Sequence, residues 1–158
     1  MSDDRRLSGP ERVARAAEAL GLAIEMRRMP ASTRTAKDAA AACGCDVAQI
    51  VKSLVFEAEG GLRLLLVSGA NRVDLDRVAR VTGEGLARAD PKRVRAETGF
   101  AIGGVPPIGH ASPLPVVMDA TLMDFALVWA AAGAPDAVFP VAPQALRAAT
   151  GARVIDVG

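Results

Sequence analysis

The sequence has few aromatic residues and few cysteines, and each scarcity excludes a class of protein. Its 158 residues include four Phe, one Trp and no Tyr, so we do not expect an aromatic platform on which single-stranded bases stack. The two cysteines, Cys43 and Cys45, are too few for a zinc site and too closely spaced for a disulfide, and we interpret them as reduced structural residues. The N-terminus lacks the apolar segment of a signal peptide, and no apolar run reaches about 18 residues. These features favour a soluble, cytoplasmic protein without a membrane partner.

Several catalytic and cofactor-binding motifs are also missing. The pair Gly103-Gly104 is not followed by Lys and Ser or Thr, so it is not a phosphate-binding P-loop, and no dinucleotide fingerprint occurs. No group of His, Cys, Asp and Glu has the spacing of metal ligands. No Gly-x-Ser-x-Gly elbow surrounds a nucleophilic serine. The sequence therefore predicts neither a metal nor a cofactor.

The charge is nearly balanced overall but unevenly distributed. Residues 1–95 hold 17 of the 19 Lys and Arg against 13 acids, whereas residues 96–158 hold 2 against 5. A basic first half is able to meet phosphates, and a solvated Arg-rich surface explains it equally well. The excess is too small for non-specific binding of duplex DNA, so we expect no DNA partner.

The order of the predicted helices and strands indicates an α+β domain. Capping residues and helical periodicity predict helices at 9–20, 36–43, 73–82, 91–98 and 143–150. Alternating or continuous apolar runs predict strands at 22–29, 51–56, 62–67, 114–118, 137–141 and 153–157. Residues 120–130 fit a helix or a strand, and we favour a strand from 126 to 131, followed by a turn at 133–136. The length fits one domain over residues 1–158, with a mixed, mostly antiparallel sheet and flanking helices.

The stretch from Gly103 to His110 is the most unusual part of the chain. Its three glycines and two prolines cannot continue a helix or a central strand. We therefore expect a shaped loop whose backbone passes close to a ligand or a neighbouring strand. The loop ends at the only histidine, His110, a group that titrates near neutrality but is more often structural than catalytic when it stands alone.

Lys52 occupies an unusual position in a predicted strand. Alternation places it on the same side as Leu54 and Phe56, so its ammonium starts from an apolar face. Two interpretations remain open: its stem covers apolar surface while its charge reaches water, or its charge is held for an anionic ligand. Asp119, after a later strand, is equally compatible with a turn, a cap or a functional role.

Taken together, these segments resemble the YbaK/EbsC family of aminoacyl-tRNA deacylases, which is related to the editing domain inserted in bacterial prolyl-tRNA synthetases. The resembling segments are Thr-Ala-Lys-Asp-Ala-Ala at 35–40, Val-Ala-Gln-Ile-Val-Lys-Ser-Leu-Val-Phe at 47–56, Gly-Gly-Val-Pro-Pro-Ile-Gly-His at 103–110 and Val-Met-Asp at 117–119. The resemblance extends from about residue 30 to 158, and residues 1–29 add an N-terminal helix and strand. It implies a YbaK-like, barrel-like sheet.

The resemblance also implies a function. The family's members are free-standing proofreading hydrolases that cleave the ester between a wrong amino acid and the terminal adenosine of a tRNA, without a cofactor. The resemblance implies that this protein's partner is the acceptor end of an aminoacyl-tRNA, and it leaves open whether a synthetase is also a partner. A non-catalytic module that binds tRNA ends or nucleotides is the alternative, and a purely structural role ranks third. The amino acid, the tRNA and the oligomeric state are not specified.

The family's functional residues map onto positions of this chain. The resemblance assigns catalysis to Lys52, which contacts the phosphate or ribose end of the tRNA, and to Gly103 and Gly104, whose backbone lies against the ester. Their amides are suited to hold a developing oxyanion. Ser53 stands at the position that helps choose the amino acid, and alanines precede Gly133 where some relatives have His or Ser. We expect further substrate contacts from Ser32, Thr33, Thr35, Pro106, Pro107, Gly109, His110 and Asp119, with His110 as a positioning residue.

Overall fold

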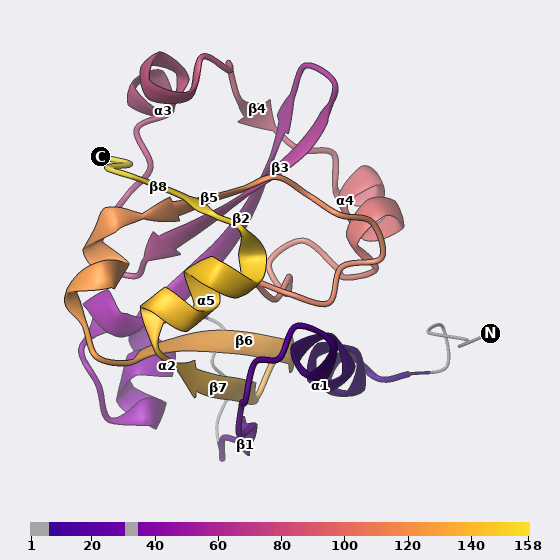
Figure 1. Ribbon diagram of the computed structural model, residues 1–158, viewed down its shortest axis with the longest axis vertical. Coiled ribbons are helices and arrows are strands. Elements are labelled where there is room, and N and C mark those ends of the chain that lie inside the picture. The colour runs from indigo at the N-terminus through magenta and orange to yellow at the C-terminus, as the bar shows by residue number, and fades with distance from the viewer. Residues whose placement is uncertain (1–6, 31–34) are drawn as a thin grey trace.

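The chain folds into two sheets with helices packed around them (Figure 1). A computed structural model describes residues 7–30 and 35–158. The larger sheet has the order β4-β2-β3-β5-β8, formed by Ala87–Arg88, Val51–Ala58, Gly61–Ser68, Val116–Asp119 and Arg153–Ile155. The smaller sheet has the order β1-β7-β6, formed by Arg27–Arg28, Ala137–Val141 and Val128–Ala134.

The pairing of the strands confirms a mixed, mostly antiparallel α+β fold. In the larger sheet β2 pairs with β3 and β4 antiparallel, whereas β5 runs parallel to both β3 and β8. All pairs of the smaller sheet are antiparallel. The two sheets meet at an isolated bridge between Ile50 and Trp129 and do not close on each other. The expected barrel-like arrangement is therefore not a closed barrel.

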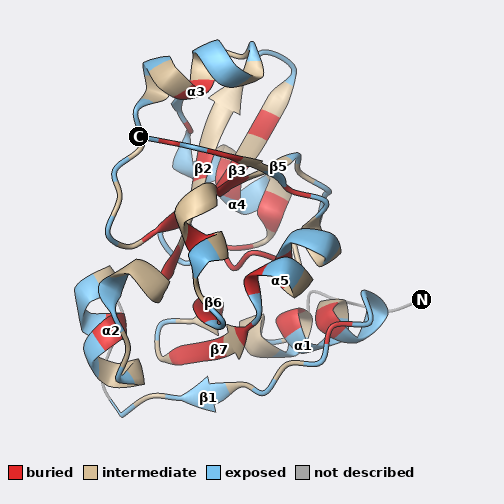
Figure 2. Ribbon diagram, turned by 60° about the vertical axis from the view of Figure 1, so that its left-hand side comes forward, coloured by how far each residue is buried: buried red, intermediate tan, exposed pale blue. Residues whose placement is uncertain are grey.

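The β2–β3 hairpin forms the centre of the core. Gly60 and Gly61 turn the chain with φ of 88° and 148°, and the register runs from Ala58 opposite Gly61 to Val51 opposite Ser68. Side chains 64 to 67 of β3 are fully buried (Figure 2). Leu64 and Leu66 face the main core, whereas Leu65 and Val67 face a second apolar cluster. This two-sided burial is why residues 64–67 are a continuous apolar run.

The helices follow the predicted caps closely. They are α1 (Gly9–Ala19), α2 (Ala36–Cys43), α3 (Leu75–Thr82), α4 (Pro91–Thr98) and α5 (Pro143–Thr150). Helix α1 packs against the β6–β7 hairpin (Figure 1), and its Val13 and Ala17 are buried in the main core. Gly9 and Gly133 touch through their backbones, since a Cβ added to Gly9 would lie 1.8 Å from the Gly133 oxygen. No helix in the described residues is long and apolar enough to cross a bilayer.

Three predictions about strands were wrong in part. Of residues 22–29 only Arg27–Arg28 pair in a ladder, because the alternation there reflects an extended chain whose Leu22, Ile24 and Met26 pack on the core without a strand partner. Residues Ala120–Asp124 form a 3-10 helix, so the next strand begins later, at Val128. That strand continues through the predicted turn to Ala134, and the two-residue β4 was not predicted.

Candidate functional site

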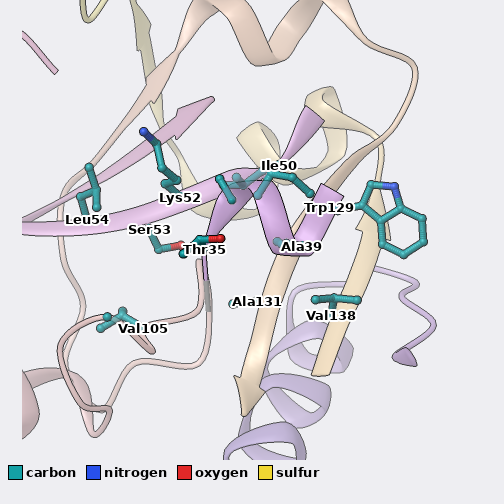
Figure 3. A pocket seen from close by; sticks show the side chains of 14 residues that line it. Thr35, Ala39, Ile50, Lys52, Ser53, Leu54, Val105, Trp129, Ala131 and Val138 are labelled. Atoms are coloured by element: carbon teal, nitrogen blue, oxygen red, sulfur yellow. The ribbon is translucent and has the colours of Figure 1, made fainter. Parts of the chain in front are cut away.

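A pocket of about 310 Å³ lies between the sheets, beside the first half of β2 (Figure 3). Strand β4 pairs with β2 only at Phe56 and Glu57, so this part of the β2 edge has no neighbouring strand in the larger sheet. The lining residues come from α2, β2, the loop after α4, β6 and β7. They are Thr35, Ala36, Ala39, Ile50, Val51, Lys52, Ser53, Leu54, Gly103, Val105, Trp129, Ala130, Ala131 and Val138. The walls are mostly small and apolar, and Lys52 is the one charged member among the described residues.

Lys52 lines the pocket on the apolar face that its place in the strand predicted, and its ammonium points away from Ser53 and Thr35 (Figure 3). It pairs across the hairpin with Val67, and its Nζ donates a hydrogen bond of 2.5 Å to the Asn71 carbonyl. Burial lowers the pKa of Lys52 below its ordinary value, an effect that the Asp119 carboxylate opposes and the Arg72 guanidinium adds to. The ammonium is thus partly desolvated and already oriented, which suits it to bind an anion.

Ser53 leaves β2 on the opposite face from Lys52 (Figure 3). Its hydroxyl oxygen is buried and has no hydrogen-bond partner among the residues that the structure describes. Beside it lies Thr35, whose hydroxyl accepts the Asp38 amide at 3.0 Å and caps α2. Because an unsatisfied buried hydroxyl is costly, the Ser53 group is a natural partner for a polar atom of a ligand.

The glycine loop contributes one glycine to this pocket rather than two. A turn from Ala101 to Gly104 is closed by the Gly104 amide, which donates to the Ala101 carbonyl at 2.9 Å. Gly103 has φ of 86°, a conformation that glycine adopts without strain. The Gly104 amide is therefore not the open donor that we expected. No backbone hydrogen bond engages the Gly103 amide within the described chain.

Residues 106–110 of the loop lie outside the pocket lining and support it. Pro106 and Pro107 are buried and do not line the pocket, and Gly109 packs on the α1 backbone with φ of 91°. The His110 Nε2 lies 2.6 Å from the Pro106 carbonyl, and burial lowers the pKa of His110. The neutral ring donates to that carbonyl and closes the loop, so the structure does not bring these four residues into the lining of the pocket.

Asp119 also lies outside the pocket lining. It is 1% exposed and accepts hydrogen bonds from the Ser68 and Thr121 amides and from the Asn71 side chain. A direct contact with substrate is therefore not available to it. Ser32 and Thr33, which we expected to contact substrate, lie outside the described residues.

Sequence reasoning missed the far wall of the pocket. Trp129, Ala130 and Ala131 of β6 and Val138 of β7 form it, and the Arg27 guanidinium stacks 5.0 Å from the centre of the Trp129 ring. The only tryptophan of the chain was the available signal. A second cavity of about 570 Å³ adjoins the first, shares Gly103 and Ala131 with it, and is lined by Arg12 and Arg95.

Known proteins share this fold and much of this sequence. The family model described as aminoacyl-tRNA editing domain matches residues 30–149. A solved structure described as a candidate trans-editing enzyme for prolyl-tRNA synthetase is 52% identical, with a TM-score of 0.90 over 96% of this chain and 98% of its own. The uncharacterized protein YwhH of Bacillus subtilis is 32% identical over 73% of this chain and 74% of its own. A proline–tRNA ligase of Xanthomonas oryzae pv. oryzae is 34% identical over 58% of this chain, which is 17% of the ligase.

Proposed function

The chain belongs to the aminoacyl-tRNA editing domain family, and on this premise we propose that it is a trans-editing deacylase for a small, wrongly attached amino acid. The observation that carries the proposal is that Lys52 and Gly103 line one pocket whose other walls are small and apolar. The names of two relatives connect them to prolyl-tRNA synthetase. The tRNA for proline is therefore the first substrate to test, and the synthetase is a partner to test with it.

The pocket suits hydrolysis that depends on positioning. In the proposed reaction a water adds to the ester carbonyl, the resulting oxyanion collapses, and the water's proton goes to the departing ribose oxygen. The Gly103 amide is the donor available to the oxyanion, a contribution worth about 3 kcal/mol in other hydrolases. Lys52 holds the phosphate or ribose of the terminal nucleotide. No carboxylate or imidazole lines the described pocket, so orientation of water and ester carries the catalysis.

The walls indicate the kind of amino acid. Alanines at 36, 39, 130 and 131, with Val105 and Val138, leave room for a short side chain. The buried Ser53 hydroxyl offers a hydrogen bond to a hydroxyl, a thiol or the α-amino group. We therefore propose alanine, serine, threonine and cysteine as the amino acids to compare.

Lys52→Ala tests the proposal. The chain is incubated with tRNA for proline charged with each of the four amino acids, and release of the amino acid is followed. We expect turnover by the native chain and a loss of at least about 100-fold in Lys52→Ala, equivalent to about 2.7 kcal/mol. Lys92→Ala, which removes an exposed lysine from α4, is the matched control and should keep full activity.

Two results would reject the deacylase. One is full activity in Lys52→Ala. The other is release at the buffer rate across the panel with every substrate, which would favour the alternative of a module that binds tRNA ends without turnover. The lack of an ionisable base in the described pocket is what supports that alternative.

A further inference from the structure

Asp119 is a buried carboxylate that touches the pocket only through other residues. It ends β5 and is 1% exposed. Its Oδ2 accepts the Ser68 amide at 3.0 Å and the Asn71 Nδ2 at 2.9 Å, and its Oδ1 accepts the Thr121 amide at 3.1 Å. A buried charge is tolerated when it is hydrogen-bonded in this way. Two of its three partners, Ser68 and Asn71, bracket the turn that follows β3.

That turn presents a carbonyl to Lys52. The Asn71 amide donates to the Ser68 carbonyl at 2.9 Å, and the Gly69 amide donates to the Ile50 carbonyl at 2.7 Å. The Asn71 side chain bonds Asp119 and, at 2.9 Å, the Thr121 hydroxyl, so its amide group is fixed from two sides. Its main-chain carbonyl then receives the Lys52 Nζ at 2.5 Å.

We propose that Asp119 is a positioning residue for Lys52, acting through Asn71, which fixes the carbonyl that aims the ammonium. The proposal rests on the proposed role of Lys52. A neutral carbonyl holds one of the three ammonium donors and leaves its charge unpaired. No ion pair involves Lys52 within the described residues, so a substrate anion would not have to displace a carboxylate.

Asp119 also acts on the charge of Lys52 from a distance. Its carboxylate raises the pKa of Lys52, while burial and Arg72 lower it. These are the charged groups that act on the ammonium in the described chain. Asp119 therefore favours the protonated form of the half-buried ammonium without occupying its donors.

Three variants separate positioning from general stability. Asn71→Ala keeps the main-chain carbonyl but removes the link to Asp119, whereas Thr121→Val removes the second bond to the same side chain and leaves the Asp119 link intact. Asp119→Asn removes the charge. Each variant is assayed for deacylation and for its unfolding midpoint. The Lys52 ammonium is titrated by NMR, where it is one of only three lysines.

We expect Asn71→Ala to fold and to lose about tenfold in kcat/KM, while Thr121→Val stays within about twofold. In Asp119→Asn the NMR titration of Lys52 should move to lower pH. Equal activities in Asn71→Ala and Thr121→Val, or an unmoved Lys52 titration in Asp119→Asn, would overturn the proposal. If the native chain does not deacylate any tRNA, the proposed function fails, and the titration still decides whether Asp119 acts on Lys52.

Discussion

Ser53 lines the pocket, Ser68 pairs across the hairpin with the lining residue Val51, and the two serines differ in how their hydroxyls are used. Ser68 is fully buried; its hydroxyl donates to the Ala48 carbonyl at 2.7 Å and accepts the Ala70 amide at 3.4 Å. The Ser53 hydroxyl is buried without a partner among the described residues. The Lys52 end of the pocket, supported by Ser68, Asn71 and Asp119, is thus complete before a ligand arrives. The end formed by Ser53 and Gly103 keeps its hydrogen-bonding groups unused.

This difference suggests that the two ends of the pocket have different roles. On the proposed function, the preorganised charge of Lys52 would orient the nucleic-acid end of the substrate without reorganisation, which is where electrostatic catalysis gains most. The unused groups of Ser53 and Gly103 would select among amino acids, because a wrong side chain leaves them unsatisfied. Substitutions at the Lys52 end should therefore lower the reaction rate and the stability of the fold. Substitutions at the end formed by Ser53 and Gly103 should alter the selectivity among amino acids.

The largest effect should come from removing the charge at the Lys52 end by pH. Burial lowers the pKa of Lys52, so the ammonium is present below that pKa and is lost as pH rises through it. We expect kcat/KM to fall up to about tenfold per pH unit on an alkaline limb that lies below the ordinary lysine range. The pKa of Cys43 is raised to about 11, so that thiol stays protonated over the limb. Spontaneous ester hydrolysis is subtracted at each pH.

Lys52→Arg is the control for this profile, because a guanidinium stays charged at alkaline pH. The kcat/KM that Lys52→Arg retains should not change with pH over the same alkaline range. An alkaline limb that persists unchanged in Lys52→Arg would assign the titration to another group.

Paired serine variants test the comparison directly. Ser68→Ala should cost about 1–3 kcal/mol of unfolding free energy, because it leaves the Ala48 carbonyl and the Ala70 amide without their partner. Ser53→Ala should stay within about 0.5 kcal/mol of the native chain or stabilise it, and should change the preference among amino acids. Urea midpoints at unchanged slope measure both. Equal destabilisation by the two variants would show that the two ends do not differ.

Paired glycine variants sharpen the account of the loop. Gly103→Ala should cost about 1–2 kcal/mol through its positive φ, since an added Cβ meets nothing within 4 Å. Gly104→Ala should be close to neutral, because its Cβ would make an ordinary contact of 3.5 Å with the Ala101 oxygen. Thermal unfolding and deacylation rates are compared. A larger loss of activity in Gly104→Ala would return the oxyanion role to Gly104.

The smallest effect concerns the route of the nucleic acid out of the pocket. Arg72 is exposed beside Lys52, whereas Arg95 is exposed in the cavity beyond Gly103. If Lys52 holds the terminal phosphate, Arg72→Gln should weaken binding of an RNA hairpin with a single-stranded 3′ end and reduce the slope of log K against log salt by about 0.7. Arg95→Gln should bind as the native chain does. The reverse result would place the RNA at the Gly103 end.

Local chemistry explains which features could be predicted from the sequence. Thr35 and Gly44 bound α2 as expected, and the alternation of β2 placed Lys52 on its apolar face, because caps and strand periodicity act over a few residues. Two partners of Asp119, Ser68 and Asn71, lie 51 and 48 residues away, so no spacing could show that Asn71 links it to Lys52. The hydrogen bond of the Gly104 amide could not be predicted, because composition marks a turn but does not say which amide closes it.

The contact between Gly9 and Gly133 bears on where the boundaries of this protein should be drawn. The family model matches residues 30–149, yet Val13 of α1, outside that match, is fully buried in the main core. The backbone at the start of α1 contacts the β6–β7 hairpin, whose Ala131 forms a wall of the pocket. The contact between Gly9 and Gly133 is too close for a side chain on either residue. We infer that the cooperative unit extends beyond the match to the family model, so a fragment trimmed to residues 30–149 would lose the support of one wall of its pocket.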